Sequence, residues 1–169
     1  MLAPGLEQRA EDIVRLYSER GLKIVTAESC TGGLVAGCLT GVAGSSAVVE
    51  RGFVTYSNEA KTELLAVPAE LIASVGAVSA ETAAAMAYGA LAHSRGDIAV
   101  SVTGIAGPGG GSPGKPVGLV HFACARRDQR PKLVEKRFGD LGRAIVRQKS
   151  VEVALDLLAE AGLAAPARP

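Results

Sequence analysis

The hydrophobic residues of this chain recur with two different periods, which predict alternating helices and strands. A first helix is predicted by apolar residues at helical spacing, at Leu6, Ala10, Ile13, Val14 and Tyr17. Gly21 is expected to end this helix. Residues 22–27 (LKIVTA) form a short apolar run that is typical of a buried strand. A tight turn at 28–33 (ESCTGG) then leads into a second helix over 34–40.

The middle of the chain continues this alternation. Residues 52–56 (GFVTY) predict a second strand, and Asn58 is a plausible N-cap for a short helix that carries Lys61. Pro68 is well placed to open another short helix over 69–74.

A long alanine-rich helix and a third strand follow. Ser79 can cap the helix, which is expected over 80–93 and ends before Gly96. Residues 97–103 (DIAVSVT) predict a strand that runs into the glycine-rich loop 104–116.

The last third of the chain predicts a hairpin and one more helix. Strands at 117–124 and 132–138 are joined by a polar turn, and the final helix starts at Asp140 or Leu141 and ends near Gly162.

Helices that alternate with strands indicate an α/β fold. We expect a single-domain layered sandwich, in which helices cover both faces of a mixed, partly parallel sheet. The domain is expected over 1–169, with a core at about 6–160 and a frayed tail at 163–169.

The composition excludes several classes of protein. Aromatic residues make up only 4% of the chain and Trp is absent, so small aliphatic side chains must fill the core. The formal net charge is +1, which predicts no strong attraction to nucleic acid or to an anionic membrane. The basic cluster at 126–137 is interrupted by Asp128 and Glu135 and is more typical of a solvated hairpin than of a nucleic-acid patch.

Other features point to the cytoplasm. No apolar run approaches the ~20 residues of a membrane span, and charges within residues 1–20 are not typical of a signal peptide. The cysteine count of 3 is odd and agrees with a reducing compartment. Cys30 and Cys38 would lie about 12 Å apart in a helix, too far for a disulfide. No spacing of Cys and His residues suggests a metal site, and no cofactor is expected.

The first candidate for chemistry is the segment 27–33 (AESCTGG), where a strand turns into a helix. A serine in such a turn, here Ser29, is exposed, and the backbone N–H groups that follow it favour an oxyanion or a phosphate. The alternative is that Ser29 or Thr31 merely caps the helix.

The second candidate is the glycine-rich segment 103–118 (TGIAGPGGGSPGKPVG). Glycines allow the backbone to approach a ligand closely. The segment is not a P-loop, because no Gly-Lys-Ser/Thr sequence leads into a helix. A plain flexible loop remains the alternative.

A catalytic base is harder to identify. His93 ends a helix and His121 lies inside a strand, so both are expected to be packing or surface residues. Lys61 remains, although it could equally be a solvated lysine on a helix face. A lysine base needs its pKa lowered from ~10.4 by burial or neighbouring positive charge. Ser57, four residues before Lys61, is a rival to Ser29 as the nucleophile.

Several long segments resemble the CinA C-terminal family. In order along the chain they are AESCTGG (27–33), GSSA (44–47), ERGFVTYSNEAK (50–61), GAVS (76–79), SVTGIAGPGGGS (101–112) and KPVG (115–118). The resemblance covers residues 6–160. It implies the family's activity, nicotinamide-nucleotide amidase, also called PncC-type deamidase, which converts nicotinamide mononucleotide to nicotinate mononucleotide and ammonia.

The resemblance also implies roles for particular residues. Ser29 is expected to be the nucleophile and Lys61 its base, with Tyr56 in the catalytic group. With Tyr56, the residues Ser46, Thr103 and Arg143 fall on positions that the family uses to line its substrate pocket. Beside these, substrate binding is also expected of four residues in the candidate segments: Thr31, Gly32, Asn58 and Gly104. A homodimer or higher homo-oligomer is expected, without nucleic-acid or membrane partners. The remaining alternatives are a nucleotide-binding regulatory module without turnover, and a competence or DNA-damage accessory protein.

Overall fold

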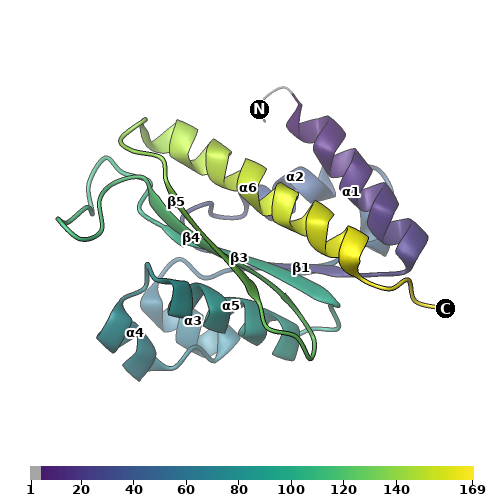
Figure 1. Ribbon diagram of the computed structural model, residues 1–169, viewed down its shortest axis with the longest axis horizontal. Helices are drawn as coiled ribbons and strands as arrows, with labels where there is room; N and C mark the ends of the chain where they lie inside the picture. Colours follow the sequence, from purple (N-terminus) through teal and green to yellow (C-terminus); the bar gives the residue numbers. More distant parts are fainter. Residues whose placement is uncertain (1–4) are drawn as a thin grey trace.

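A five-stranded mixed sheet forms the middle layer of the computed structural model, which describes residues 5–169 (Figure 1). Its strand order is β2-β1-β3-β4-β5. The strands are β1 (Ile24–Glu28), β2 (Val49–Val54), β3 (Ile98–Gly104), β4 (Leu119–Arg126) and β5 (Lys132–Arg137). β1 pairs in parallel with β2 and β3, whereas β3–β4 and β4–β5 are antiparallel. The predicted mixed sheet and its late hairpin are confirmed.

Helices cover both faces of the sheet, as expected. They are α1 (Leu6–Arg20), α2 (Leu34–Thr40), α3 (Asn58–Leu65), α4 (Ala69–Val75), α5 (Ala80–Ala92) and α6 (Arg143–Ala164), with a 3-10 turn η1 (Ser45–Ala47). α1, α2 and α6 lie on one face and α3, α4 and α5 on the other (Figure 1). One buried cluster packs under each group of helices, around Tyr17 and Phe122 on the first face and around Met86 on the second.

Small residues let the second helical layer pack closely, in agreement with the few aromatic residues in the composition. Buried alanines of α5 (Ala83, Ala87 and Ala90) face the sheet. A Cβ at Gly89 would overlap the carbonyl oxygen of Leu65, so the contact between α5 and α3 requires glycine at this position.

Some predicted boundaries are wrong by a few residues. The last helix begins at Arg143 rather than at Asp140 or Leu141, because Gly139 and Gly142 have φ angles of 79° and 85°, which interrupt a helix. Asn58 is not the cap of α3. Ser57 is, with an extended backbone and a side chain that accepts a hydrogen bond from the Ala60 N–H.

The C-terminal tail packs against the end of α1 and against the segment that precedes β3. Residues 1–4, which the expected domain includes, lie outside the described residues. In the tail that the sequence predicts to fray, α6 continues to Ala164. The Arg168 N–H then donates to the Arg20 carbonyl, and the Arg168 guanidinium pairs with Asp97.

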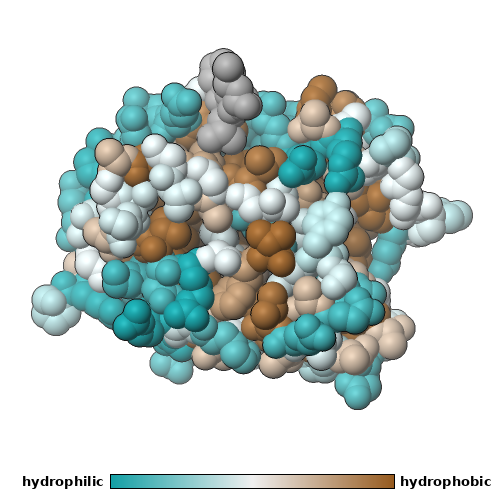
Figure 2. Space-filling view, turned by 180° about the vertical axis from the view of Figure 1, so that it is seen from behind, coloured by the Kyte–Doolittle hydropathy of each residue, from teal (hydrophilic) through white to brown (hydrophobic). Residues whose placement is uncertain are grey.

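No helix within residues 5–169 is long and apolar enough to cross a membrane. On the face opposite to that of Figure 1, hydrophobic residues form separate groups among hydrophilic ones (Figure 2).

Candidate active site

The carboxyl ends of β1, β2 and β3 meet at one edge of the sheet and form a cleft of about 230 Å³. Ligand-binding groups of parallel sheets usually lie at this edge. Its lining residues come from the segments that follow these strands, from the loop before α5 and from the start of α6: Ser29, Cys30, Tyr56, Asn58, Lys61, Ala77, Val78, Thr103, Gly104, Ala106 and Arg143.

A serine and a lysine face each other in this cleft. Nζ of Lys61 lies 3.1 Å from Oγ of Ser29, 2.9 Å from the Thr55 carbonyl oxygen and 3.4 Å from the Ser57 carbonyl oxygen. The Ser57 cap starts α3 directly after β2, which turns Lys61 in the first turn of that helix back toward the end of β1. The sequence therefore brings together two groups that are separated by 32 residues.

The environment of Lys61 favours its neutral form. The residue is only 1% exposed, and this burial lowers the pKa of its amino group from the ordinary value of 10.5. A neutral amine has two N–H groups and one lone pair. With the N–H groups donated to the Thr55 and Ser57 carbonyls, the lone pair faces the Ser29 hydroxyl, as a general base requires.

The rival nucleophiles are less suited to attack. Cys30 lines the cleft beside Ser29, but burial raises the pKa of its thiol to about 12, so the reactive thiolate is scarce at neutral pH. The Ser57 hydroxyl accepts the Ala60 N–H as a helix cap, and only the Ser57 carbonyl approaches Lys61.

Glu28 occupies the start of α2, a position that the sequence analysis assigned to an anionic ligand. The side chain is 0% exposed, and its carboxylate accepts hydrogen bonds from the N–H groups of Gly33, Val35 and Ala36. These three N–H groups are therefore occupied and do not face a ligand. The alternative that Ser29 or Thr31 caps this helix is wrong, since the capping acceptor is Glu28.

Tyr56, which is expected in the catalytic group, and Arg143, which is expected to bind substrate, contact each other across the cleft. The Arg143 guanidinium donates to the Tyr56 hydroxyl at 2.6 Å and to the Gly107 carbonyl at 3.1 Å. Arg143 therefore ties the start of α6 to the glycine-rich loop and to the segment after β2. Asn58 and Gly104 also line the cleft.

Thr103 lines the same cleft, but its hydroxyl has a structural partner. Oγ1 donates to the Ala77 carbonyl at 2.7 Å and holds the loop before α5 against the end of β3. The loop is tied a second time by Lys115, whose Nζ donates to the Val75 carbonyl at 2.6 Å.

Three expected binding residues do not line the cleft. Thr31 is fully buried, and Gly32 belongs to the turn after Ser29, where its N–H donates to the Ser29 carbonyl. Ser46 lies in η1, before β2, and therefore at the amino end of the parallel strands rather than at the carboxyl end. It lines a different hollow, which it shares with Lys23.

Neither histidine lines the cleft. His93 is exposed at the end of α5, and His121 is buried in β4 opposite Glu135. Within residues 5–169, no group of three or more His, Cys, Asp or Glu side chains is arranged to hold a metal ion.

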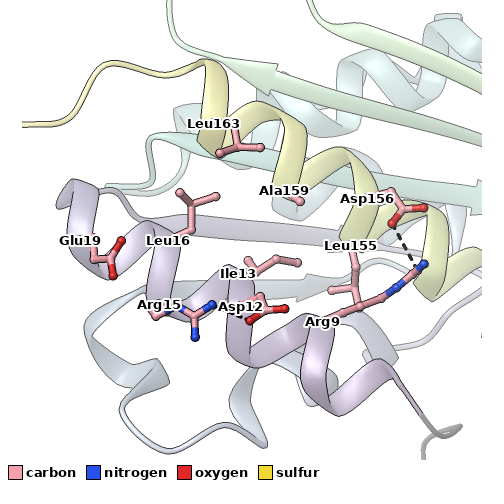
Figure 3. Close-up of a pocket in the computed structure, with 10 residues that line it drawn as sticks. All are labelled: Arg9, Asp12, Ile13, Arg15, Leu16, Glu19, Leu155, Asp156, Ala159 and Leu163. Carbon is pink, nitrogen blue, oxygen red and sulfur yellow. Dashed lines mark hydrogen bonds and ion pairs between the residues drawn. The ribbon is translucent and has the colours of Figure 1, made fainter.

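A larger hollow of about 390 Å³ lies between α1 and α6 (Figure 3). Its lining includes apolar side chains such as Leu16 and Leu163, and Arg9 in this lining pairs with Asp156. It contains no nucleophile with an adjacent base and none of the expected site residues. Chemistry rather than volume therefore identifies the smaller cleft as the candidate active site.

Comparison with known proteins gives matches to a family model, to related sequences and to solved structures. The family model described as CinA C-terminal domain matches residues 6–161. The Escherichia coli protein named nicotinamide-nucleotide amidohydrolase PncC is 55% identical over 120 residues, which cover 71% of this chain and 73% of that protein. The crystal structure of the competence/damage inducible protein CihA from Agrobacterium tumefaciens superposes with a TM-score of 0.93 at 52% identity, covering 95% of this chain and 97% of that one.

Other relatives are much longer than this chain. A putative competence-damage inducible protein from Caldicellulosiruptor bescii is 49% identical over 148 residues, which cover 88% of this chain but 36% of that protein. The chain spans roughly a third of the length of several such relatives.

Proposed function

The chain belongs to the CinA C-terminal domain family, and from this premise we propose that the protein is a nicotinamide-nucleotide amidase. It hydrolyses the carboxamide of nicotinamide mononucleotide to give nicotinate mononucleotide and ammonia. The observation that carries the proposal is the 3.1 Å approach of Lys61 Nζ to Ser29 Oγ in a cleft at the strand ends. The name of the E. coli relative supports the choice of substrate.

The first half of the reaction is acyl transfer to Ser29. Neutral Lys61 accepts the hydroxyl proton while Oγ forms a bond to the carboxamide carbon, and the carbonyl π electrons move to its oxygen. When this tetrahedral intermediate collapses, the C–N bond breaks and Lys61 returns the proton to the departing nitrogen, which leaves as ammonia. The pyridinium ring of the substrate withdraws electrons from the carbonyl carbon and favours the attack.

The second half regenerates the enzyme. Lys61 accepts a proton from water, the hydroxide oxygen bonds to the acyl carbon, and the ester bond to Ser29 breaks as the proton returns to Oγ. The product is formed as the carboxylic acid of nicotinate mononucleotide, which gives its remaining proton to solvent and leaves as the carboxylate. The lysine alternates between base and acid, so both halves require a pKa near the working pH, which agrees with the lowered pKa of Lys61.

Arg143 is the proposed phosphate ligand. Its guanidinium lies at the rim of the cleft, and it has N–H groups beyond those donated to Tyr56 and Gly107. A guanidinium can donate two parallel hydrogen bonds to a phosphate. The Tyr56 ring, which is 59% exposed, is placed to contact the nucleotide from the same side.

The decisive experiment measures ammonia release from nicotinamide mononucleotide by purified protein, with Ser29→Ala as the matched control. Release by the wild type that Ser29→Ala abolishes supports the proposal. Binding of the mononucleotide by the wild type without ammonia release would instead indicate a nucleotide-binding module. If the wild type neither binds the mononucleotide nor releases ammonia, the proposal is refuted.

A further inference from the structure

The hollow between α1 and α6 is an apolar surface for which the proposed reaction has no use. Its apolar residues come from both helices: Ile13, Leu16, Leu155, Ala159 and Leu163. Leu163 is 64% exposed, the largest exposed fraction of any large hydrophobic side chain within residues 5–169. No residue of this hollow also lines the candidate active site. An apolar surface with polar residues around it is typical of a site where another protein docks.

The charged residues that line this hollow on α1 alternate in sign. In chain order they are Arg9, Asp12, Arg15 and Glu19, and all four are exposed. Their spacing of three, three and four residues places them along one side of the helix, as Figure 3 shows. The stripe therefore reads positive, negative, positive, negative from the start of α1 to its end.

A stripe with this order of charges is complementary to its own reverse. If two copies of α1 lie antiparallel across a twofold axis, the first charge of one copy meets the last charge of the other. Arg9 then faces Glu19 of the partner subunit, and Asp12 faces Arg15 of the partner subunit. A parallel pair in register would place like charges together, which is unfavourable. Charges of both signs also disfavour a nucleic acid or an anionic membrane as the partner.

Ion pairs within the chain leave these side chains able to bond to a second copy. Arg15 pairs with Asp12 at 2.7 Å, and Arg9 pairs with Asp156 of α6 at 3.2 Å. The four side chains are between 49% and 65% exposed. A guanidinium has five N–H donors and a carboxylate accepts several hydrogen bonds, so each group keeps capacity for a further partner. Exposed pairs of this kind contribute little to the stability of a single chain.

We propose that this face is the interface of a homodimer, in which α1 and the hollow beside it pack on the same surface of a second copy across a twofold axis. The apolar residues of the hollow, Leu163 above all, supply the buried area, and the charge stripe sets the antiparallel orientation. Because the interface is isologous, every substitution in it acts twice in each dimer. The inference does not depend on the proposed amidase function.

Sedimentation velocity of the whole chain, from about 1 to 100 µM, measures the dissociation constant Kd of the dimer. Leu163→Asn should raise Kd by at least about 100-fold, because each copy loses the burial of a leucine side chain. The matched control is Leu133→Asn, since Leu133 is 47% exposed on β5 and does not line the hollow. This control should keep the wild-type Kd.

Two charge reversals test the antiparallel arrangement. In Arg15→Glu the new carboxylate meets Asp12 of the partner subunit, and in Asp12→Arg the new guanidinium meets Arg15 of the partner subunit. Each variant alone should therefore dimerise about tenfold more weakly or worse. Mixed in equal amounts, the two variants place opposite charges at both contacts and should associate as tightly as the wild type. Glu11→Arg, an exposed reversal on α1 outside the hollow, should have no effect.

Rescue by mixing is the decisive result, because no effect within one chain can produce it. A wild type that sediments as a monomer over the whole range would overturn the inference and leave the hollow to a different partner. A dimer that Leu163→Asn and both charge reversals leave unchanged would place the interface elsewhere and also overturn it. If the reversals weaken the dimer and their mixture does not associate, the antiparallel arrangement is refuted. Circular dichroism checks each variant, and if Leu163→Asn does not fold, the mixing experiment decides.

Discussion

Replacement of the buried lysine gives the sharpest test of the proposed chemistry. We expect Lys61→Met to lower kcat by about 100- to 10,000-fold, which is the usual contribution of a positioned general base. Lys61→Arg should be nearly as damaging although it preserves the positive charge, because a guanidinium cannot lose its proton under working conditions.

The pH dependence of the wild type follows from the direction of the pKa shift. Burial lowers the pKa of Lys61, so the fraction of neutral base rises with pH through an ionisation below 10.5. The value of kcat/KM should therefore climb about tenfold per pH unit below that ionisation and level off above it. Steady-state ammonia release measured between pH 6 and 10 gives this profile directly.

The same shift affects stability. A lysine with a folded-state pKa below its unfolded-state value destabilises the fold fully below the folded pKa, and this cost disappears as the pH rises to the unfolded value near 10.5. Each pKa unit corresponds to about 1.4 kcal/mol. Lys61→Met removes the cost but leaves the Thr55 carbonyl without its donor, at about 1–3 kcal/mol. The free energy of unfolding of Lys61→Met relative to wild type should therefore fall as the pH increases.

Two results would refute this reasoning. A Lys61→Arg variant with more than about a tenth of the wild-type kcat would reduce the lysine to an electrostatic role. A profile of kcat/KM that climbs up to pH 10 without levelling off, together with a pH-independent stability difference, would show that Lys61 keeps its ordinary pKa in the fold.

Three further predictions concern the groups around the dyad. Ser29→Ala should abolish turnover, whereas Ser57→Ala should keep most of the turnover and lower the stability by about 1 kcal/mol through the lost helix cap. Measurements of kcat and of thermal unfolding on both variants check this, and the reverse result for turnover would make Ser57 the nucleophile. Arg143→Ala should lower kcat/KM for the mononucleotide by about 10- to 150-fold while changing that for nicotinamide riboside much less, and equal losses on the two substrates would exclude a phosphate contact. Glu28→Gln should destabilise the fold by about 1–3 kcal/mol in chemical denaturation, since the amide offers one acceptor oxygen in place of two, and an unchanged midpoint would contradict this role of the cap.

The sequence predicts the order and type of the elements well, because this information is local. Strands such as β1 and β3 are short apolar runs, and α1 and α5 have strong helical periodicity or a clear serine cap. The exact ends of the elements are predicted less well, because neighbouring residues can give equally good local signals. Ser57 and Asn58 are both good capping residues in neighbouring positions, and only the extended backbone at Ser57 decides between them.

The candidate site is predictable in part. Local spacing offered Ser57 as readily as Ser29 as the partner of Lys61, and the resemblance to a family was needed to prefer the distant residue. The same resemblance placed Ser46 in the site, although the segment before β2 lies at the far end of the strands. Glu28 was missed altogether, and so was Arg147, whose guanidinium donates to the Cys30 and Thr31 carbonyls. A buried carboxylate cap and a guanidinium that grips two carbonyls are tertiary contacts, and no local pattern announces them.

The burial of Lys61 destabilises the fold, and the proposed function explains why the fold retains it. Lys61 is buried among neutral acceptors rather than beside a carboxylate partner, and burial of a charge without a partner is unfavourable. The fold relieves this cost only by releasing the proton, which is the state that general-base catalysis requires. Glu28 and Arg147, by contrast, are satisfied by several hydrogen bonds each and hold the turn rigidly around Ser29. The destabilised group is therefore the one that must move a proton, and the well-bonded groups are those that must not move.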